Sequence, residues 1–410
     1  MAGSVKRVAL VSMHTSPVEQ AGTGDSGGLN ISLMSTATEL AARGVEVDLL
    51  TRATSVPRTT QLSDGVVLRE LAAGPAAPLG KAELASVADE FGEAVASVAG
   101  RPGSRYDLIH AHYWLSGLAT LPVAIELGIP LVQSFHTLGA MKNSHLAPGQ
   151  DAEPAGRLLA ERYLANQANA MVASSTSEVT SLIDQVGAPA GRIWVIPPGV
   201  DVDLFRPDRG GAAERVREQF GIEPGRPIVA VVGRVQPLKD QELGVRALGA
   251  LNALRGWAPV LVIAGESTPG DEAYLASLHH LAAQLGVGDE VRFAGALGRD
   301  DLADLLAVAS ITLVPSHSET FGLVALESAA SGTAVIGYRG TGMLESIAEG
   351  RSGVLVDSRE PDAWARAMVA LLDDPSARSR MAETAREHAL GYTWAATATA
   401  LLGVYTSLLA

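Results

Sequence analysis

Short apolar runs alternate with longer segments of helical periodicity along nearly the whole chain, and this alternation restricts the possible folds more than any other feature. The runs are continuous in Val, Ile and Leu, which is typical of parallel strands buried on both faces. Repeated alternation of such strands with helices predicts doubly wound sheets. We expect strands at residues 7–12, 45–51, 65–71, 107–112, 130–135, 169–174, 192–196, 227–233, 259–264, 290–294, 310–315, 333–337 and 353–356.

The turn-rich segment Pro197–Gly211 separates these strands into two series and has the composition of a domain linker. A chain of 410 residues also exceeds the size of one ordinary α/β domain. We therefore predict an α/β protein with two Rossmann-like domains, at 1–203 and 204–388, followed by a helical segment at 389–410. Ligands of open α/β sheets bind outside the carboxyl ends of the strands, so we expect the active site in a cleft between the two sheets.

The composition excludes several classes of function. The formal net charge is −14 and there is no cysteine. Because general nucleic-acid binding depends on a positive surface, an anionic ligand of this chain must instead be held by a few placed cations. The lack of cysteine removes disulfides, thiolate metal sites and cysteine nucleophiles. Every apolar run is shorter than the ~18 residues of a membrane span, and we expect a cytoplasmic protein that binds neither membrane nor nucleic acid.

The glycine-rich segment Gly22–Asn30 follows the first predicted strand and contains the pattern G-x-G-x-x-G. In a dinucleotide-binding fingerprint the glycines follow the strand almost directly, whereas Met13–Ala21 intervenes here. The segment fits better as a loop that ends at a helix N-terminus, where the amides of Gly27 and Gly28 bind a diphosphate. An NAD(P)-dependent oxidoreductase is the alternative that the pattern leaves open.

Charged residues follow two predicted strands of the second series. Arg234 and Lys239 are separated by a turn, so both can reach one anion and neutralise the charge that develops on a leaving diphosphate. Glu319 and Glu327 suit hydroxyl groups, because a carboxylate accepts hydrogen bonds from adjacent hydroxyls. We assign Glu327 to a ribose diol and Glu319 to the transferred sugar. A second phosphate nest is expected at the backbone amides of Thr320, Phe321, Gly322 and Leu323.

Histidines follow three predicted strands of the first domain, at His14, His112 and His136. The carboxyl ends of parallel strands meet at one edge of a sheet, so we expect these side chains to cluster. Three histidines can bind zinc, but the glycines, cations and carboxylates elsewhere favour a site for a sugar and a phosphate. The D-x-D sequence Asp201–Asp203 is interpreted as turn chemistry in the linker, away from the cleft.

Together these motifs resemble the GT-B fold and the retaining glycosyltransferase family 4 over nearly the whole chain. The resemblance rests on the glycine loop, the Gly199-Val-Asp sequence, the Gly233–Lys239 segment, the pair of glutamates and a C-terminal Tyr-Thr-Trp sequence. It implies a glycosyltransferase that uses a nucleotide-sugar donor, a last helix that crosses back onto the first domain, and a homodimer.

Within that family, the N-terminal half resembles the actinobacterial mycothiol-pathway branch, which joins N-acetylglucosamine from UDP-GlcNAc to 1L-myo-inositol 1-phosphate. The matching stretches are 14–17, 22–30, 43–47, 51–54, 112–117 and 136–143. This resemblance implies that Asn30 lies near the inositol hydroxyls and that four residues hold the acceptor phosphate, namely Lys81, Tyr113, Thr137 and Arg157. Two cations, a phenol and a hydroxyl are chemically suited to a phosphate dianion.

Departures from the family pattern concentrate on the donor side, at 265–270 and 331–343. They leave open a glycosyltransferase of secondary metabolism with another UDP- or GDP-sugar and a thiol or aminocyclitol acceptor. A non-catalytic sensor of sugar phosphates is a further alternative. Since no carboxylate is an obvious covalent nucleophile, we expect a front-face displacement in which His136 orients the donor sugar. We expect no cofactor, and Mg²⁺ is not expected to be essential.

Overall fold

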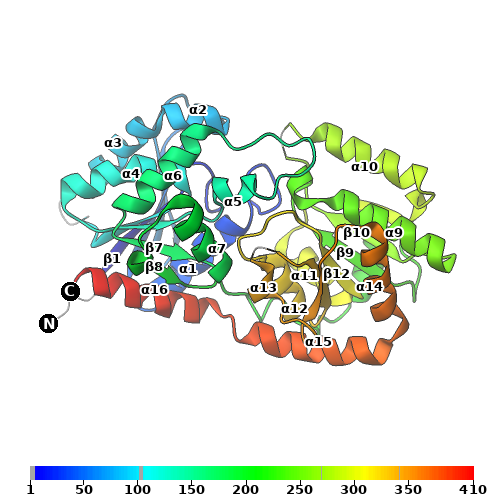
Figure 1. The fold of residues 1–410 in the computed structure, drawn as a ribbon. Coiled ribbons are helices and arrows are strands. Elements are labelled where there is room, and N and C mark those ends of the chain that lie inside the picture. Colours follow the sequence, from blue (N-terminus) through cyan, green and yellow to red (C-terminus); the bar gives the residue numbers. More distant parts are fainter. Residues whose placement is uncertain (1–4, 101–104, 269, 341) are drawn as a thin grey trace.

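The computed structural model describes residues 5–100, 105–268, 270–340 and 342–410. Parts of the first predicted domain, residues 1–4 and 101–104, therefore lie outside the described residues, as do positions 269 and 341 of the donor-side segments noted above. Two lobes lie side by side, and each is built around a mostly or wholly parallel sheet with helices on both faces (Figure 1).

The first sheet has the strand order β3-β4-β2-β1-β5-β6-β7-β8. Neighbouring strands are parallel except for β3 and β4, which are antiparallel. Its strands are β1 (Arg7–Val11), β2 (Glu46–Arg52), β3 (Arg58–Ser63), β4 (Val66–Leu71), β5 (Leu108–His112), β6 (Leu131–Ser134), β7 (Ala170–Ala173) and β8 (Ile193–Val195). The helices of this lobe are α1 (Gly28–Ala41), α2 (Lys81–Ser86), α3 (Ala88–Ala99), α4 (Trp114–Leu127), α5 (Gly139–Asn143), α6 (Ala155–Gln167) and α7 (Thr176–Ser181).

The second sheet is parallel throughout, in the order β11-β10-β9-β12-β13-β14. Its strands are β9 (Ile228–Val232), β10 (Val260–Ala264), β11 (Val291–Gly295), β12 (Ile311–Val314), β13 (Ala334–Tyr338) and β14 (Gly353–Val356). The helices that follow the linker are α8 (Ala212–Phe220), α9 (Gln241–Arg255), α10 (Glu272–Gln284), α11 (Arg299–Val308), α12 (Leu323–Ala330), α13 (Met343–Ser346), α14 (Pro361–Asp373), α15 (Pro375–Leu390) and α16 (Trp394–Leu408). Strand order reverses between β9 and β12, and a ligand crevice forms at such a point.

Each predicted strand is present within one residue of its expected bounds, and the predicted fold class is confirmed. Strand β3 was not predicted from the sequence; it is an edge strand with mostly exposed residues. It has no continuous apolar run, because only one of its neighbours is another strand and neither of its faces is buried in the core.

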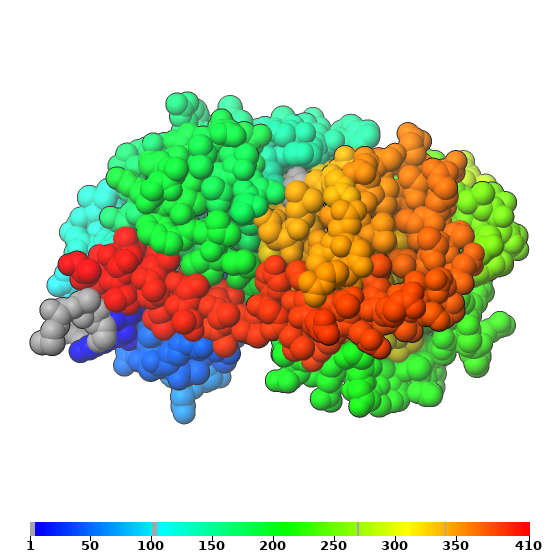
Figure 2. Space-filling model, turned by 60° about the horizontal axis from the view of Figure 1, so that its bottom comes forward, coloured from blue at the N-terminus to red at the C-terminus, as the bar shows by residue number. Residues whose placement is uncertain are grey.

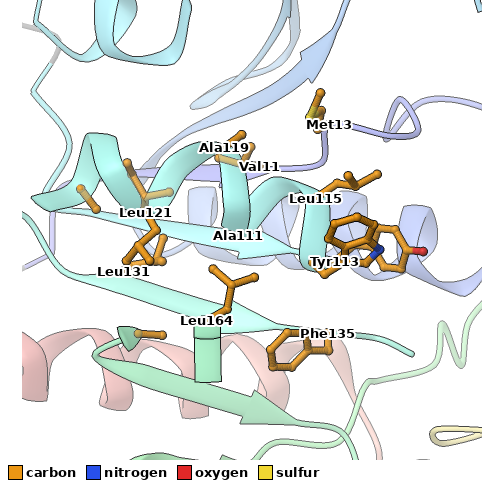
Figure 3. Close-up of a cluster of buried hydrophobic side chains, with 14 of the residues drawn as sticks. Val11, Met13, Ala111, Tyr113, Leu115, Ala119, Leu121, Leu131, Phe135 and Leu164 are labelled. Carbon is orange, nitrogen blue, oxygen red and sulfur yellow. The ribbon is translucent and has the colours of Figure 1, made fainter. Parts of the chain in front are cut away.

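The hydrophobic core of the first lobe reaches the strand ends that carry candidate site residues (Figure 3). Side chains of β1, β5 and β6 pack there against α4 and α6, with contributions from Val11, Ala111, Leu131, Leu115, Ala119 and Leu164. Tyr113 and Phe135, which directly follow β5 and β6, belong to the same cluster. The rigid core therefore sets the position of the loops after these strands.

The C-terminal helix α16 returns to the first lobe, as the family resemblance implied. The α15–α16 segment runs along one face of the molecule across both lobes (Figure 2). Leu401 and Tyr405 of α16 are buried in the same cluster as Leu33 of α1. The crossing passes close to Gly199, where a Cβ atom would lie 2.2 Å from the backbone nitrogen of Trp394. This close approach explains the glycine of the Gly199-Val-Asp sequence.

Among the described residues, none of the helices combines the length and the apolar character that a membrane span requires.

Candidate active site

A cavity of about 930 Å³ lies between the two lobes, at the carboxyl ends of their strands. Every residue assigned above to the donor, the acceptor or the chemistry lines it, namely Gly27, Gly28, Asn30, Lys81, Tyr113, His136, Thr137, Arg157, Arg234, Lys239, Glu319, Thr320, Phe321, Gly322, Leu323 and Glu327. The tertiary structure thus brings the whole predicted set together, while the individual roles stay predictions.

Two helix N-termini meet in this cavity. Helix α1 begins at Gly28 and α12 begins at Leu323, so the glycine loop does end at a helix N-terminus. A Cβ atom on Gly28 would lie only 2.9 Å from Cδ1 of Leu323, and glycine is what permits this approach. The loop also contacts the second lobe, where the Glu266 amide donates to the Gly22 carbonyl at 3.1 Å. The Gly27 amide, predicted to bind a diphosphate, instead donates to Asn30 Oδ1 at 2.9 Å. The Gly28 amide and the dipoles of both helices are left to favour an anion here.

Asp25 links two of the predicted phosphate-binding cations. Its Oδ1 accepts hydrogen bonds from Lys81 Nζ at 2.6 Å and from Arg234 Nη1 at 3.2 Å. Burial raises the pKa of Asp25, but Lys81 and Arg234 outweigh this effect and hold the pKa below its ordinary value. Sequence reasoning missed Asp25 as a site residue. A carboxylate inside a loop predicted to bind phosphate indicates that cations lie nearby. The sequence could not show which cations these are, because Lys81 and Arg234 lie in distant parts of the chain.

Lys239 and Glu319 form an ion pair at 2.6 Å in the second lobe. The same Glu319 oxygen accepts a hydrogen bond from Ser316 Oγ at 2.7 Å. Both residues follow strands that flank the switch point of the sheet, Lys239 after β9 and Glu319 after β12. The predicted diphosphate cation and the predicted sugar-binding carboxylate therefore lie within contact distance of each other.

Glu327 is buried in α12 and pairs with Arg299, whose Nη1 donates to Oε1 at 2.5 Å. Burial raises the pKa of Glu327, against the opposing effect of Arg299. No hydrogen bond to Oε2 is present among the described residues, so this oxygen is the one available to a ribose hydroxyl. Since each carboxylate oxygen can accept two hydrogen bonds, the contact with two adjacent hydroxyls expected from the sequence does not require the Arg299 pair to break. Arg299 begins α11, lies over the ring of Phe205 at 4.6 Å and was not anticipated.

Arg157 is the centre of the predicted acceptor site and is almost fully buried. Its Nε donates to Glu161 at 2.7 Å, Nη1 to Glu153 at 2.8 Å, and Nη2 to the Thr137 carbonyl at 2.7 Å and its hydroxyl at 3.1 Å. The guanidinium carbon lies 5.0 Å from the centre of the Tyr113 ring. Two of the other predicted phosphate ligands, Tyr113 and Thr137, thus contact this one fixed cation.

Lys142 adds a further cation to this group and pairs with Glu153. Burial lowers the pKa of Lys142, and the positive charges of Arg157 and Lys81 act in the same direction. Lys142 also lines the cavity. Lys142 lies in the stretch 136–143 that resembles the family, but its role was not predicted from the sequence.

Asn30 holds the glycine loop. Its Nδ2 donates to Thr15 Oγ1 at 3.0 Å and to the Ser16 carbonyl at 2.7 Å, and its Oδ1 accepts from the Gly27 amide at 2.9 Å. Both amide protons are therefore engaged within the protein. A contact with a substrate hydroxyl, as the resemblance implied, is left to the second lone pair of Oδ1.

The histidines cluster as predicted, and His110 joins them. His112 Nδ1 lies 2.8 Å from His136 Nε2, and the His14 ring centre lies 4.3 Å from that of Tyr113. Burial lowers the pKa of His136 to about 4 and those of His14 and His110 to about 3, so these rings are neutral at pH 7. Across the part of the chain that the structure describes, no group of three His, Asp or Glu residues is arranged to hold a metal ion. The zinc interpretation therefore gains no support.

The linker carboxylate Asp201 makes the predicted turn contacts but lies in a different place from the one predicted. Its Oδ1 accepts hydrogen bonds from the amides of Asp203 at 3.2 Å and Leu204 at 3.0 Å, which confirms the turn chemistry. However, Asp201 lines the cavity instead of lying away from it. The linker passes beside α12, and Asp201 is close enough to Glu327 to raise the pKa of that residue.

Comparisons with known proteins show the family of the chain. Residues 26–204 match the model of Glycosyltransferase Family 4, and residues 212–388 match that of Glycosyl transferases group 1. A D-inositol 3-phosphate glycosyltransferase of Thermomonospora curvata is 41% identical over 98% of this chain and 95% of the relative. One of Corynebacterium glutamicum is 40% identical over 98% of this chain and 97% of the relative.

Solved structures show the same architecture. Sucrose-phosphate synthase from Thermosynechococcus elongatus superposes with a TM-score of 0.89 at 29% identity, covering 98% of this chain and 99% of that one. Anabaena Alr3699/HepE in complex with UDP and glucose superposes with a TM-score of 0.77 at 20% identity, covering 98% and 100%, and shows the fold alone. These matches, together with a glycine loop separated from its strand, contradict the oxidoreductase alternative.

Proposed function

The chain belongs to glycosyltransferase family 4, and from this premise we propose that it transfers a sugar from a nucleotide diphosphate to a phosphorylated cyclitol. The best specific assignment is N-acetylglucosamine from UDP-GlcNAc as the donor and 1L-myo-inositol 1-phosphate, a D-inositol 3-phosphate, as the acceptor. The names of the curated relatives support the acceptor class. The donor base, the sugar, metal independence and a homodimeric state remain predictions.

The observation that carries this proposal is the presence of two cation groups in one cavity of an acidic protein. Lys81, Lys142 and Arg157 come from the first lobe, and Arg234 and Lys239 from the second. A chain of net charge −14 has no general attraction for anions, and each of these five cations is paired with a carboxylate of the site. Two groups of such ion pairs fit two separate phosphate ligands, each of which takes a place beside the cations that a carboxylate now holds. A phosphorylated acceptor and a nucleotide diphosphate meet this requirement together.

The geometry supports a front-face mechanism. The bond between the anomeric carbon and the diphosphate oxygen breaks while the acceptor hydroxyl oxygen bonds to the same face of that carbon. The hydroxyl proton passes to the departing phosphate oxygen. Arg234, Lys239 and the amides at the N-termini of α1 and α12 then stabilise the charge on the diphosphate.

The neutral histidines suit orientation better than charge neutralisation. Because burial keeps the pKa of His136 near 4, its ring can exchange hydrogen bonds with sugar hydroxyls but adds no positive charge at pH 7. Glu319 adds a carboxylate for the sugar hydroxyls. Retention of configuration follows from attack on the face that the diphosphate leaves.

The proposal is tested by measuring release of the nucleoside diphosphate. UDP-GlcNAc, UDP-glucose and GDP-mannose are each incubated with inositol 1-phosphate, with unphosphorylated inositol and without acceptor, in the presence and absence of EDTA. We expect release that depends on the phosphate of the acceptor, is fastest with UDP-GlcNAc and persists in EDTA, and NMR of the product should show a retained anomeric configuration. Equal release with and without inositol 1-phosphate overturns the acceptor assignment, and loss in EDTA overturns metal independence.

A further inference from the structure

A hydrogen bond between two neutral histidines lies at the edge of the candidate site. His112 Nδ1 and His136 Nε2 are 2.8 Å apart, and the two rings face each other edge to edge, with centres 5.1 Å apart and planes inclined by 28°. Burial keeps the pKa of both residues well below the ordinary value for histidine. Each ring therefore carries one ring proton at pH 7, and only one of the two facing nitrogens is protonated.

The surroundings of His112 decide which nitrogen this is. His112 is buried, and its Nε2 has no hydrogen-bond partner anywhere in the described ranges of the chain. If the proton were on His136 Nε2, the proton of His112 would be on this Nε2, where a buried N–H would lack an acceptor. If the proton is on His112 Nδ1, the buried Nε2 is only an unused acceptor. Buried N–H groups without a partner are the rarer of the two in proteins.

The ring of His112 packs against His110, which the crossing helix α16 holds in place. The His110 ring lies 4.1 Å from the His112 ring, between centres. His110 is itself held by Tyr405 of α16, whose hydroxyl lies 2.6 Å from Nδ1, and by Ser134 Oγ at 2.9 Å from Nε2. Tyr405 and His110 are almost completely buried. The orientation of His112 is therefore set by the core and by the return of the C-terminal helix.

The backbone of His136 is constrained by its own conformation and by a contact with the second lobe. Its backbone has φ of +59°, a region that non-glycine residues rarely adopt. Its carbonyl accepts a hydrogen bond from Thr320 Oγ1 of the second lobe. No protein group of the described part of the chain hydrogen-bonds its Nδ1, and His136 lines the cavity.

We infer that His112 is a positioning residue that donates Nδ1–H to His136 Nε2 and so fixes His136 as the tautomer that presents an Nδ1–H donor to the cavity. His136 then donates this proton in a hydrogen bond to an oxygen of the transferred sugar. The kinetic part of this inference rests on the proposed function, whereas the direction of the hydrogen bond does not.

The direction of the hydrogen bond is measured without substrate. Long-range ¹H–¹⁵N correlation spectra of the full chain, labelled at histidine and assigned with His136→Gln and His112→Asn variants, report which ring nitrogen carries the proton. We expect a proton on Nδ1 of both His112 and His136. A proton on Nε2 of His136 refutes the inference, whatever the enzyme turns out to transfer.

The matched variants His112→Asn and His112→Asp test the consequence for catalysis. Asn has nearly the shape of Asp but offers an N–H where His112 Nδ1 lies, whereas an ionised Asp offers only acceptors and forces the opposite tautomer on His136. At about pH 8 we expect His112→Asn to keep kcat within about fivefold of the wild type and His112→Asp to lose about 100-fold, with little change in the donor KM. The same two substitutions at His280, an exposed histidine of α10, serve as the control.

The outcomes separate the inference from the proposed function. Equal losses of kcat in the Asn and Asp variants, with both folded by circular dichroism, show that ring packing matters instead of proton direction and overturn the inference. If no acceptor supports turnover in the wild type, the proposed function fails, and the NMR measurement still decides the direction of the hydrogen bond.

Discussion

Replacing Lys239 by alanine tests the central electrostatic claim about the site. At about 3 Å from a phosphate oxygen and an effective dielectric constant of about 20, one positive charge contributes about 5.5 kcal/mol of attraction. Lys239 is paired with Glu319 at 2.6 Å, and that pair must loosen before Lys239 can meet the diphosphate. If this offsets about half of the attraction, about 2.7 kcal/mol remains, which corresponds to a rate loss of about 100-fold.

The assay is steady-state release of the nucleoside diphosphate with donor and acceptor varied separately. Because charge on the diphosphate increases as the bond breaks, we expect Lys239→Ala to lower kcat more than it raises the donor KM. Arg246→Ala, an exposed residue of the neighbouring helix α9, is the matched control and should leave both constants unchanged. Turnover of Lys239→Ala within about threefold of the wild type refutes the reasoning, as does a loss confined to KM.

Three further predictions concern the groups around the cavity. Arg157→Met should lower the free energy of unfolding by about 3–5 kcal/mol, because it leaves the buried Glu161 carboxylate unpaired. Adding Glu161→Gln should restore part of this loss. Urea unfolding measures the stability of both variants, and a loss below about 1 kcal/mol in Arg157→Met contradicts the buried pair. Burial raises the pKa of Glu178 to about 7 from its ordinary 4.5, so the folded state holds a proton that the unfolded chain releases as pH rises from about 4.5 to 7. Glu178→Gln should therefore be more stable than the wild type by about 3 kcal/mol at pH 8, and the difference should vanish near pH 4.5; a difference that does not change with pH disproves the shift. Gly28→Ala should weaken UDP binding by about tenfold in calorimetry because the new methyl group meets Leu323, and Gly28→Ala combined with Leu323→Ala should recover the binding if that contact is the cause.

Much of the site was predictable because its residues occupy positions that local pattern identifies. Arg234 and Glu319 follow continuous apolar runs, and such runs become buried strands whose carboxyl ends face the cleft. Gly28 opens a helix after a glycine-rich loop, which the sequence shows directly. The edge strand β3 lacked any apolar run, and the linker residue Asp201 was placed away from the cleft that it in fact lines, because a turn pattern does not say where a linker runs.

The sequence by itself determined the two sheets, all of their strands except the edge strand β3, and the residues available at the strand ends, because these depend on burial patterns and backbone preferences over a few neighbouring positions. Only the tertiary structure decided how those residues pair. Asp25 meets Lys81 and Arg234, which lie 56 and 209 positions away along the chain, and His112 is oriented through His110 by Tyr405 of the last helix. Contacts of this kind depend on how the two lobes and the crossing helix pack together, and no short-range preference of the chain encodes that arrangement.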